Sequence, residues 1–274
     1  DGSSGLPANE SCTSLRADPS DPDRFFAATI GPGNVGSVWL STDGGATWTS
    51  ISSGISGLGT AGRIELAVHG TATTQSIFAA VLASNSGQPS GVFRSVDAGT
   101  TWTAMDLPFT VETSGNIGTN PKVKPVSEDD PGGQGRIHFS MVADPTNPNL
   151  VYIGGDRQPG PAENVGFPNS IGAVNYSGRL FRGDASRSSG SQWVHLTHSN
   201  SRGPTGGGTA SGTSPHADSR DLAFDLAGNL LECDDGGIYR RTNPTNNTGD
   251  WSAIMGNMQT TEFYSVAYDP LNNF

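Results

Sequence analysis

An eight-residue pattern occurs twice in this chain of 274 residues and constrains its fold more than any other feature. The pattern reads STDGGATW from Ser41 to Trp48 and SVDAGTTW from Ser95 to Trp102, so the second copy starts 95 − 41 = 54 residues after the first. Each copy lies between two short apolar runs. A strand, a glycine-rich turn and a second strand form a β-hairpin, so the pattern predicts two equivalent hairpins.

The conserved spacing within the pattern suggests what each residue does in the turn. The carboxylates of Asp43 and Asp97 can accept hydrogen bonds from backbone N–H groups of their own turns. Glycine supplies backbone angles that a Cβ atom forbids. Trp48 and Trp102 are predicted to pack under the turns as anchors. We therefore expect these residues to fold hairpins rather than to catalyse a reaction.

Weaker copies of the hairpin, and a second recurring element, extend the repeat along the chain. Two later hairpins keep the strands and the tryptophan, which is Trp193 in one and Trp251 in the other. Both lack the Ser-x-Asp-x-Gly turn. Upstream of the hairpins, pairs of apolar runs are joined by turns that contain aspartate, often as Asp-Pro. Together they predict four-stranded units at about 12–53, 62–107, 136–198 and 218–256, with a further unit starting at 263–274.

The octad resembles the Asp-box, or BNR repeat, of sialidases, sortilin-type receptors and xyloglucanases. This resemblance implies an all-β protein, a single β-propeller over 1–274 built from four-stranded antiparallel blades with Asp-box hairpins. No second strand follows Asp269-Pro270, so only part of the ring is expected in this chain. The missing blades would come from another chain or segment; a four-bladed ring, with the tail completing the first blade, is the alternative.

Composition narrows the class of partner. The chain has 15 Lys and Arg against 26 Asp and Glu, a net charge of −11, which disfavours nucleic acid as a partner. No apolar run is long enough for a membrane span. The acidic, lysine-poor composition fits a secreted or extracellular or periplasmic protein. Cys12 and Cys233 fall on well-separated blades, so we expect two unpaired thiols, with a single bridge as the alternative.

Propellers bind ligands over the central channel, where the loops that enter each blade converge. The densest polar cluster enters the fourth unit and contains His216, Asp218 and Arg220; Asp235 follows in a turn of the same unit. With Arg136, which like Arg63 and Arg220 lies near the start of a first strand, these are the predicted ligand-binding residues. Arginines there could clamp an acidic ligand. The alternative is that these residues only form turns and hold a long loop.

The segment Asp234-Asp235-Gly236-Gly237-Ile238-Tyr239-Arg240 resembles the surroundings of a catalytic aspartate in xyloglucanases. This resemblance implies that Asp234 is a catalytic carboxylate, although glycoside hydrolysis normally needs two. The predicted function is a secreted carbohydrate-active propeller that binds a polysaccharide or glycan. The further prediction is that it also hydrolyses this ligand. The alternative is a non-catalytic, sortilin-like scaffold for protein or peptide. No cofactor is expected, with calcium left open through Asp234 and Asp235 or through 128–130.

Overall fold

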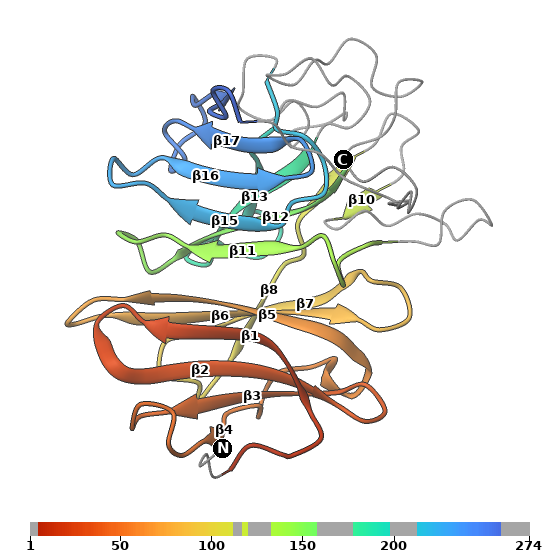
Figure 1. Ribbon diagram of the computed structural model, residues 1–274, viewed down its shortest axis with the longest axis vertical. Helices are drawn as coiled ribbons and strands as arrows, with labels where there is room; N and C mark the ends of the chain where they lie inside the picture. Colours follow the sequence, from red (N-terminus) through yellow and green to blue (C-terminus); the bar gives the residue numbers. More distant parts are fainter. Residues whose placement is uncertain (1–4, 112–116, 120–132, 158–177, 198–212, 259–274) are drawn as a thin grey trace, which may run out of the picture.

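The computed structural model describes residues 5–111, 117–119, 133–157, 178–197 and 213–258. It contains four antiparallel sheets of four strands each, in which consecutive strands are neighbours. We call them blades 1 to 4 (Figure 1). The predicted all-β class and four-stranded units are therefore confirmed. The fifth unit at 263–274, the acidic run at 128–130 and most of the long loops lie outside the described residues.

The strands follow the chain from blade to blade. Blade 1 consists of β1 (Ser11–Asp18), β2 (Asp21–Gly31), β3 (Val35–Ser41) and β4 (Thr49–Ser50). Blade 2 consists of β5 (Ala61–Gly70), β6 (Gln75–Ala83), β7 (Pro89–Ser95) and β8 (Thr103–Met105), and a short 3-10 helix, η1 (Leu58–Thr60), precedes it. Blade 3 consists of β11 (Ser140–Ala143), β12 (Leu150–Arg157), β13 (Gly178–Asp184) and β14 (Trp193–His195). Blade 4 consists of β15 (Asp221–Phe224), β16 (Leu230–Asp234), β17 (Gly237–Arg241) and β18 (Trp251–Ala253).

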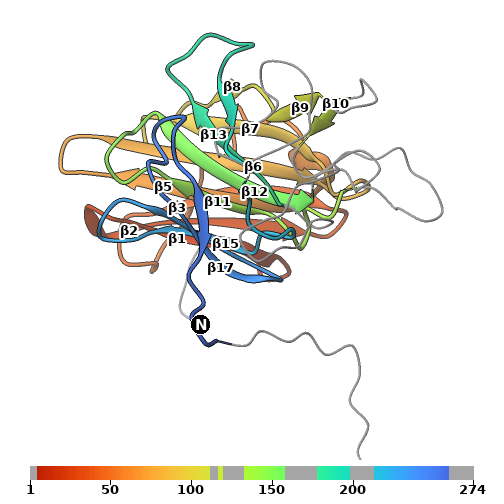
Figure 2. The same ribbon diagram turned by 90° about the horizontal axis from the view of Figure 1, so that it is seen from above.

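A small hairpin lies between blades 2 and 3 in the chain. In it, β9 (Phe109–Val111) pairs with β10 (Ile117–Thr119). The hairpin lies outside the four sheets (Figure 2), and β9 contacts β14 of blade 3. Among the described residues, no helix has the length and apolarity needed to cross a membrane. Cys12 and Cys233 are free and exposed, as expected.

The blades are arranged around their first strands. β1 contacts β5, β5 contacts β11, and β11 contacts β15, so the first strands stand side by side in chain order. Figure 1 shows β5 and β11 between β1 and β15. This is the radial order of propeller blades, in which first strands line the axis.

Apolar cores lie between successive blades because β6 and β12, middle strands of blades 2 and 3, are buried on both faces. On β6, Ile77, Ala79 and Val81 pack toward blade 1, whereas the alternate residues Phe78 and Ala80 pack toward blade 3. Side chains of a strand alternate between its two faces, so one apolar run serves two cores. A third core joins blades 3 and 4 around Tyr152, Tyr239 and Trp251.

The tryptophan of each hairpin after the first also ties its blade to the preceding one. The indole N–H of Trp102 donates to the carbonyl of Ile51 over 2.8 Å, that of Trp193 to Asp106 over 2.6 Å, and that of Trp251 to Leu196 over 3.1 Å. Each acceptor lies just after the preceding blade's outer strand. This role explains why the later hairpins keep the tryptophan after losing the Asp-box turn.

The Asp-box turns have the predicted hydrogen bonds. In the first, Asp43 Oδ1 accepts the Ser41 hydroxyl over 2.8 Å and the Thr47 N–H over 2.9 Å. In the second, Asp97 Oδ1 accepts the equivalent groups of Ser95 and Thr101, both over 2.8 Å. Trp48 differs from Trp102, because its indole N–H donates to the carbonyl of Gly45 within its own turn.

Candidate functional site

The candidate site lies where blades 3 and 4 begin. We call His138, Asp156, Asp218, Arg220 and Asp235 the channel-mouth cluster. His138 precedes β11, Asp156 lies near the end of β12, Asp218 and Arg220 precede β15, and Asp235 lies in the β16–β17 turn. Strands β11 and β15 are neighbours, so the fold brings together residues from distant parts of the chain.

Close backbone packing fixes the segment that carries Asp218. The N–H of Ser219 donates to the carbonyl of Gly155 over 3.0 Å, and the hydroxyls of Ser140 and Ser219 share a hydrogen bond of 2.6 Å. Gly154 is required there, since a Cβ atom on it would collide with both hydroxyls. Asp218 itself adopts a φ of 70°, which aspartate tolerates better than most residues.

The geometry of the cluster is compact. His138 Nδ1 lies 3.6 Å from Asp218 Oδ1, and Arg220 Nη2 lies 3.0 Å from Asp235 Oδ1. Burial, followed by the charges of Asp156 and Asp235, raises the pKa of Asp218 to about 7, against the opposing effect of Arg220. Burial and the Arg220 charge lower the pKa of His138. At neutral pH the cluster therefore holds a neutral imidazole beside a carboxyl group that is easily protonated.

The structure gives Asp234 a place inside the β16–β17 turn. Its Oδ1 accepts the N–H groups of Gly236 and Gly237 over 2.7 and 2.9 Å, and the residue is only 7% exposed. Burial raises its pKa to about 7, against the opposing effects of the Glu232 carboxyl group and the two glycine N–H groups. The pKa of the fully buried Glu232 is raised by burial and by Asp234. The two glycine N–H bonds are those of a turn-forming carboxylate, and Glu232 is a second buried carboxyl group on the same strand.

Of the other predicted ligand-binding residues, His216 lies beside the β16–β17 turn and Arg136 lies at the start of blade 2. His216 is half-buried against Gly236, so it lies beside the turn that Asp234 holds. Arg136 is exposed and lies against Gly62 at the start of blade 2. The sequence pointed to Asp218, Arg220 and Asp235 but not to His138 or Asp156. The signal that could have found His138 is its position just before a first strand: it lies two residues before β11, as Asp218 lies three residues before β15.

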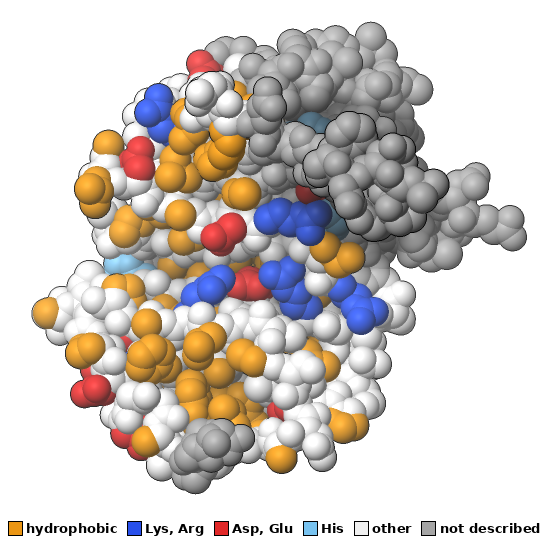
Figure 3. All heavy atoms as spheres, viewed as in Figure 1, with side chains coloured by type: hydrophobic (Ala, Val, Ile, Leu, Met, Phe, Trp, Pro, Cys, Tyr) orange, Lys and Arg blue, Asp and Glu red, His pale blue; other side chains and the backbone are white. Residues whose placement is uncertain are grey.

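A second group of charges continues along the first strands. Glu65 on β5 accepts hydrogen bonds from Arg16 of β1 and from Arg63, each over 2.6 Å, and from the Ser14 hydroxyl over 3.0 Å. Both arginines are thus paired with a carboxylate, as Arg220 is. In Figure 3 the charged side chains gather across the middle of this face, between the levels of β1 and β15. We call this set the first-strand charge row: Arg16, Glu65, Arg63, Arg220, Asp235.

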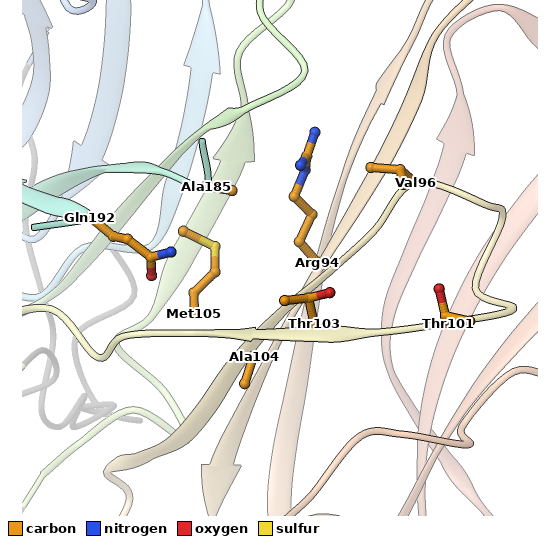
Figure 4. A pocket seen from close by; sticks show the side chains of 8 residues that line it. All are labelled: Arg94, Val96, Thr101, Thr103, Ala104, Met105, Ala185 and Gln192. Carbon is orange, nitrogen blue, oxygen red and sulfur yellow. The ribbon is translucent and has the colours of Figure 1, made fainter. Parts of the chain in front are cut away.

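A hollow of about 270 Å³ lies beside the row. Its walls come from all four first strands and include Arg16, Ala67, Met141, Asp221 and Leu222. A smaller pocket of about 110 Å³ lies away from this face, between β8 and the β13–β14 hairpin. Figure 4 shows the Met105 and Gln192 side chains at that pocket, with Arg94 extending along it. Arg94 is used structurally there, since it donates to Pro148 and Asn149 of blade 3.

The four-stranded blades, their radial order and the two Asp-box turns define the architecture as an Asp-box β-propeller. No protein-family model matches the chain, and no curated protein does. Its solved neighbours include YCF48 from Cyanidioschyzon merolae, with a TM-score of 0.44 and 16% identity over 91% of this chain and 58% of that one.

Two further solved structures also match the chain. The GH74 xyloglucanase from Xanthomonas campestris has a TM-score of 0.35 and 16% identity, covering 87% of this chain and 38% of that one. The SapL1 lectin in complex with alpha methyl fucoside has a TM-score of 0.46 and 11% identity, covering 89% of this chain and 64% of that one. The chain thus spans less than two thirds of each of these three neighbours.

Proposed function

We propose that this chain is a secreted carbohydrate-binding β-propeller that holds a neutral polysaccharide across its first-strand face. The observation that carries the proposal is the first-strand charge row, in which each arginine is paired with a carboxylate. Glu65 is only 3% exposed and holds Arg16 and Arg63 in place, so the groups left for a ligand are the remaining guanidinium N–H donors and the exposed Asp235 carboxylate. Sugar hydroxyls are donors and acceptors at once, so an alternating row of this kind suits them.

The charge balance favours a neutral ligand over an acidic one. Glu65 neutralises part of the charge of Arg16 and Arg63, and Asp235 pairs with Arg220. The chain as a whole carries a net charge of −11, which repels polyanions. An acidic sugar would have to break these ion pairs before an arginine could clamp it.

Apolar surface next to the row supports the same ligand class. Ile137 is 60% exposed, and its carbonyl accepts a hydrogen bond from Arg63 over 3.3 Å. The hollow beside Arg16 is lined by small and branched apolar side chains as well as by Asp221. Binding sites for small polar ligands combine apolar walls with a few placed polar groups.

Binding measurements on the full chain test this proposal. Titration calorimetry with a neutral glucan oligosaccharide, a polygalacturonate oligosaccharide and an unrelated peptide should detect binding of the neutral glycan alone. Arg63→Met should weaken that binding roughly tenfold, because one or two hydrogen bonds to a charged group are lost. Arg187→Met, at an exposed ion pair of 3.2 Å in blade 3, is the matched control and should leave it unchanged.

Two results would contradict the proposal. Tight binding of the peptide without any glycan would favour the sortilin-like scaffold, and preference for polygalacturonate would contradict the charge argument. The finer proposal, hydrolysis with Asp234 as the acting carboxylate, has its own test. Release of reducing sugar by the wild type that Asp234→Asn abolishes would support it, and unchanged release would remove Asp234 from the mechanism.

A further inference from the structure

Two buried polar atoms in the channel-mouth cluster face each other without a hydrogen bond. They are His138 Nδ1 and Asp218 Oδ1, 3.6 Å apart, and no described residue forms a hydrogen bond with either. His138 is only 7% exposed, so its ring is held almost entirely inside the protein. Nearly all buried polar atoms in proteins have a partner, and exceptions call for an explanation such as a bound ion.

A third group completes a possible ligand set around the same point. Asp235 offers a carboxylate oxygen, and the three ligand atoms of His138, Asp218 and Asp235 all lie within 4.8 Å of one another. In a tetrahedral zinc site with bonds of about 2.0–2.1 Å, two ligand atoms lie roughly 3.3 Å apart. The 3.6 Å between the histidine nitrogen and the aspartate oxygen is close to that separation.

We infer that His138, Asp218 and Asp235 form a binding site for a first-row divalent cation such as Zn²⁺ or Mn²⁺. The inference does not rest on the proposed glycan binding, although Asp235 belongs both to the first-strand charge row and to this ligand set. Imidazole nitrogen favours zinc and similar ions, and two carboxylates add the charge that any divalent ion needs. Calcium and magnesium prefer oxygen ligands throughout, so this set is less suited to them.

The surrounding charges are compatible with a cation. Asp156 interacts with Asp218 and adds a third carboxylate to the cluster. Arg220 is the opposing charge, but both of its hydrogen bonds to Asp235, over 3.0 and 3.2 Å, end on Oδ1. Oδ2 of Asp235 therefore lies outside this ion pair and is the oxygen we assign to the ion. Three carboxylates against one guanidinium leave the cluster net negative.

Metal titration of the full chain, without an affinity tag, tests the inference. Cys233 is exposed and one residue from Asp234, so a Cys233→Ser background removes a thiolate that could bind Zn²⁺ by itself. In that background, calorimetry with ZnCl₂ should give one site per chain, and MnCl₂ should compete for it. His138→Ala removes a direct ligand and Asp235→Asn replaces an anionic ligand by a neutral amide, so each should weaken Zn²⁺ binding by roughly 100-fold.

Asp221→Asn is the matched control, because Asp221 lies on β15 close to Asp218 but outside the ligand set. It should leave Zn²⁺ affinity unchanged. Circular dichroism of each variant checks that it is folded. If His138→Ala is unfolded, the Zn²⁺ affinity of Asp235→Asn alone tests the inference, because Asp235 is exposed and its substitution should not disturb the fold. Absence of Zn²⁺ and Mn²⁺ binding in the Cys233→Ser protein, or equal affinity in the folded Asp235→Asn variant, would overturn the inference.

Discussion

Single residues in the Asp-box turns show how a short pattern determines structure. Asp43 accepts three hydrogen bonds within its turn, from Ser41 and from both the N–H and the hydroxyl of Thr47. All three favour the ionised carboxylate. The sequence contained this information because donor and acceptor lie within eight residues, and local turn geometry requires no other part of the chain.

The titration of Asp43 tests this residue-scale account. The Thr47 hydroxyl, the Thr47 N–H and the Ser41 hydroxyl lower the pKa of Asp43 from its usual 3.8 to about 2. A lowered pKa in the folded state means that the carboxylate contributes stability above pH 3.8, and that this contribution is lost as the pH falls through about 2. Carboxyl-carbon NMR should give this midpoint, and Thr47→Val should move it back toward 3.8. A wild-type midpoint near 4 would show that the turn bonds are absent in solution.

At the scale of strands and blades, long side chains link neighbouring sheets. Arg182 on β13 donates to the carbonyl of Pro244 and to the side chain of Asn247, both over 2.9 Å, and so joins blade 3 to blade 4. Arg94 on β7 makes the corresponding link from blade 2 to blade 3. The recurring Phe-Arg of these strands was visible in the sequence. Its partners were not, because nothing local indicates which turn of the next blade the arginine reaches.

Removing this link should destabilise the protein. Arg182 is buried, so Arg182→Met leaves a buried carbonyl without its donor and should lower the free energy of unfolding by about 2 kcal/mol. Arg187→Met in the same blade removes only an exposed ion pair and should cost less than about 1 kcal/mol. Urea denaturation followed by tryptophan fluorescence measures both. Equal effects of the two substitutions would refute the interblade role of Arg182.

At the scale of the whole molecule, the sequence predicted the units but not how they meet. The repeats predicted four-stranded sheets, since hairpins and Asp turns are local features. The channel-mouth cluster depends instead on the alignment of β11 with β15, which places His138 beside Asp218. For the same reason the sequence suggested that Arg63 and Arg220 could clamp an acidic ligand, while the structure pairs them with Glu65 and Asp235.

The central claim is that the first-strand face binds a neutral polysaccharide, and amide NMR of the full chain during titration with a neutral glucan oligosaccharide tests it most directly. The account predicts that shift changes concentrate on β1, β5, β11 and β15, around Arg16, Glu65 and Arg220, and leave the outer strands β4, β8 and β18 unchanged. Shift changes confined to the outer strands, or none at saturating oligosaccharide, would contradict it.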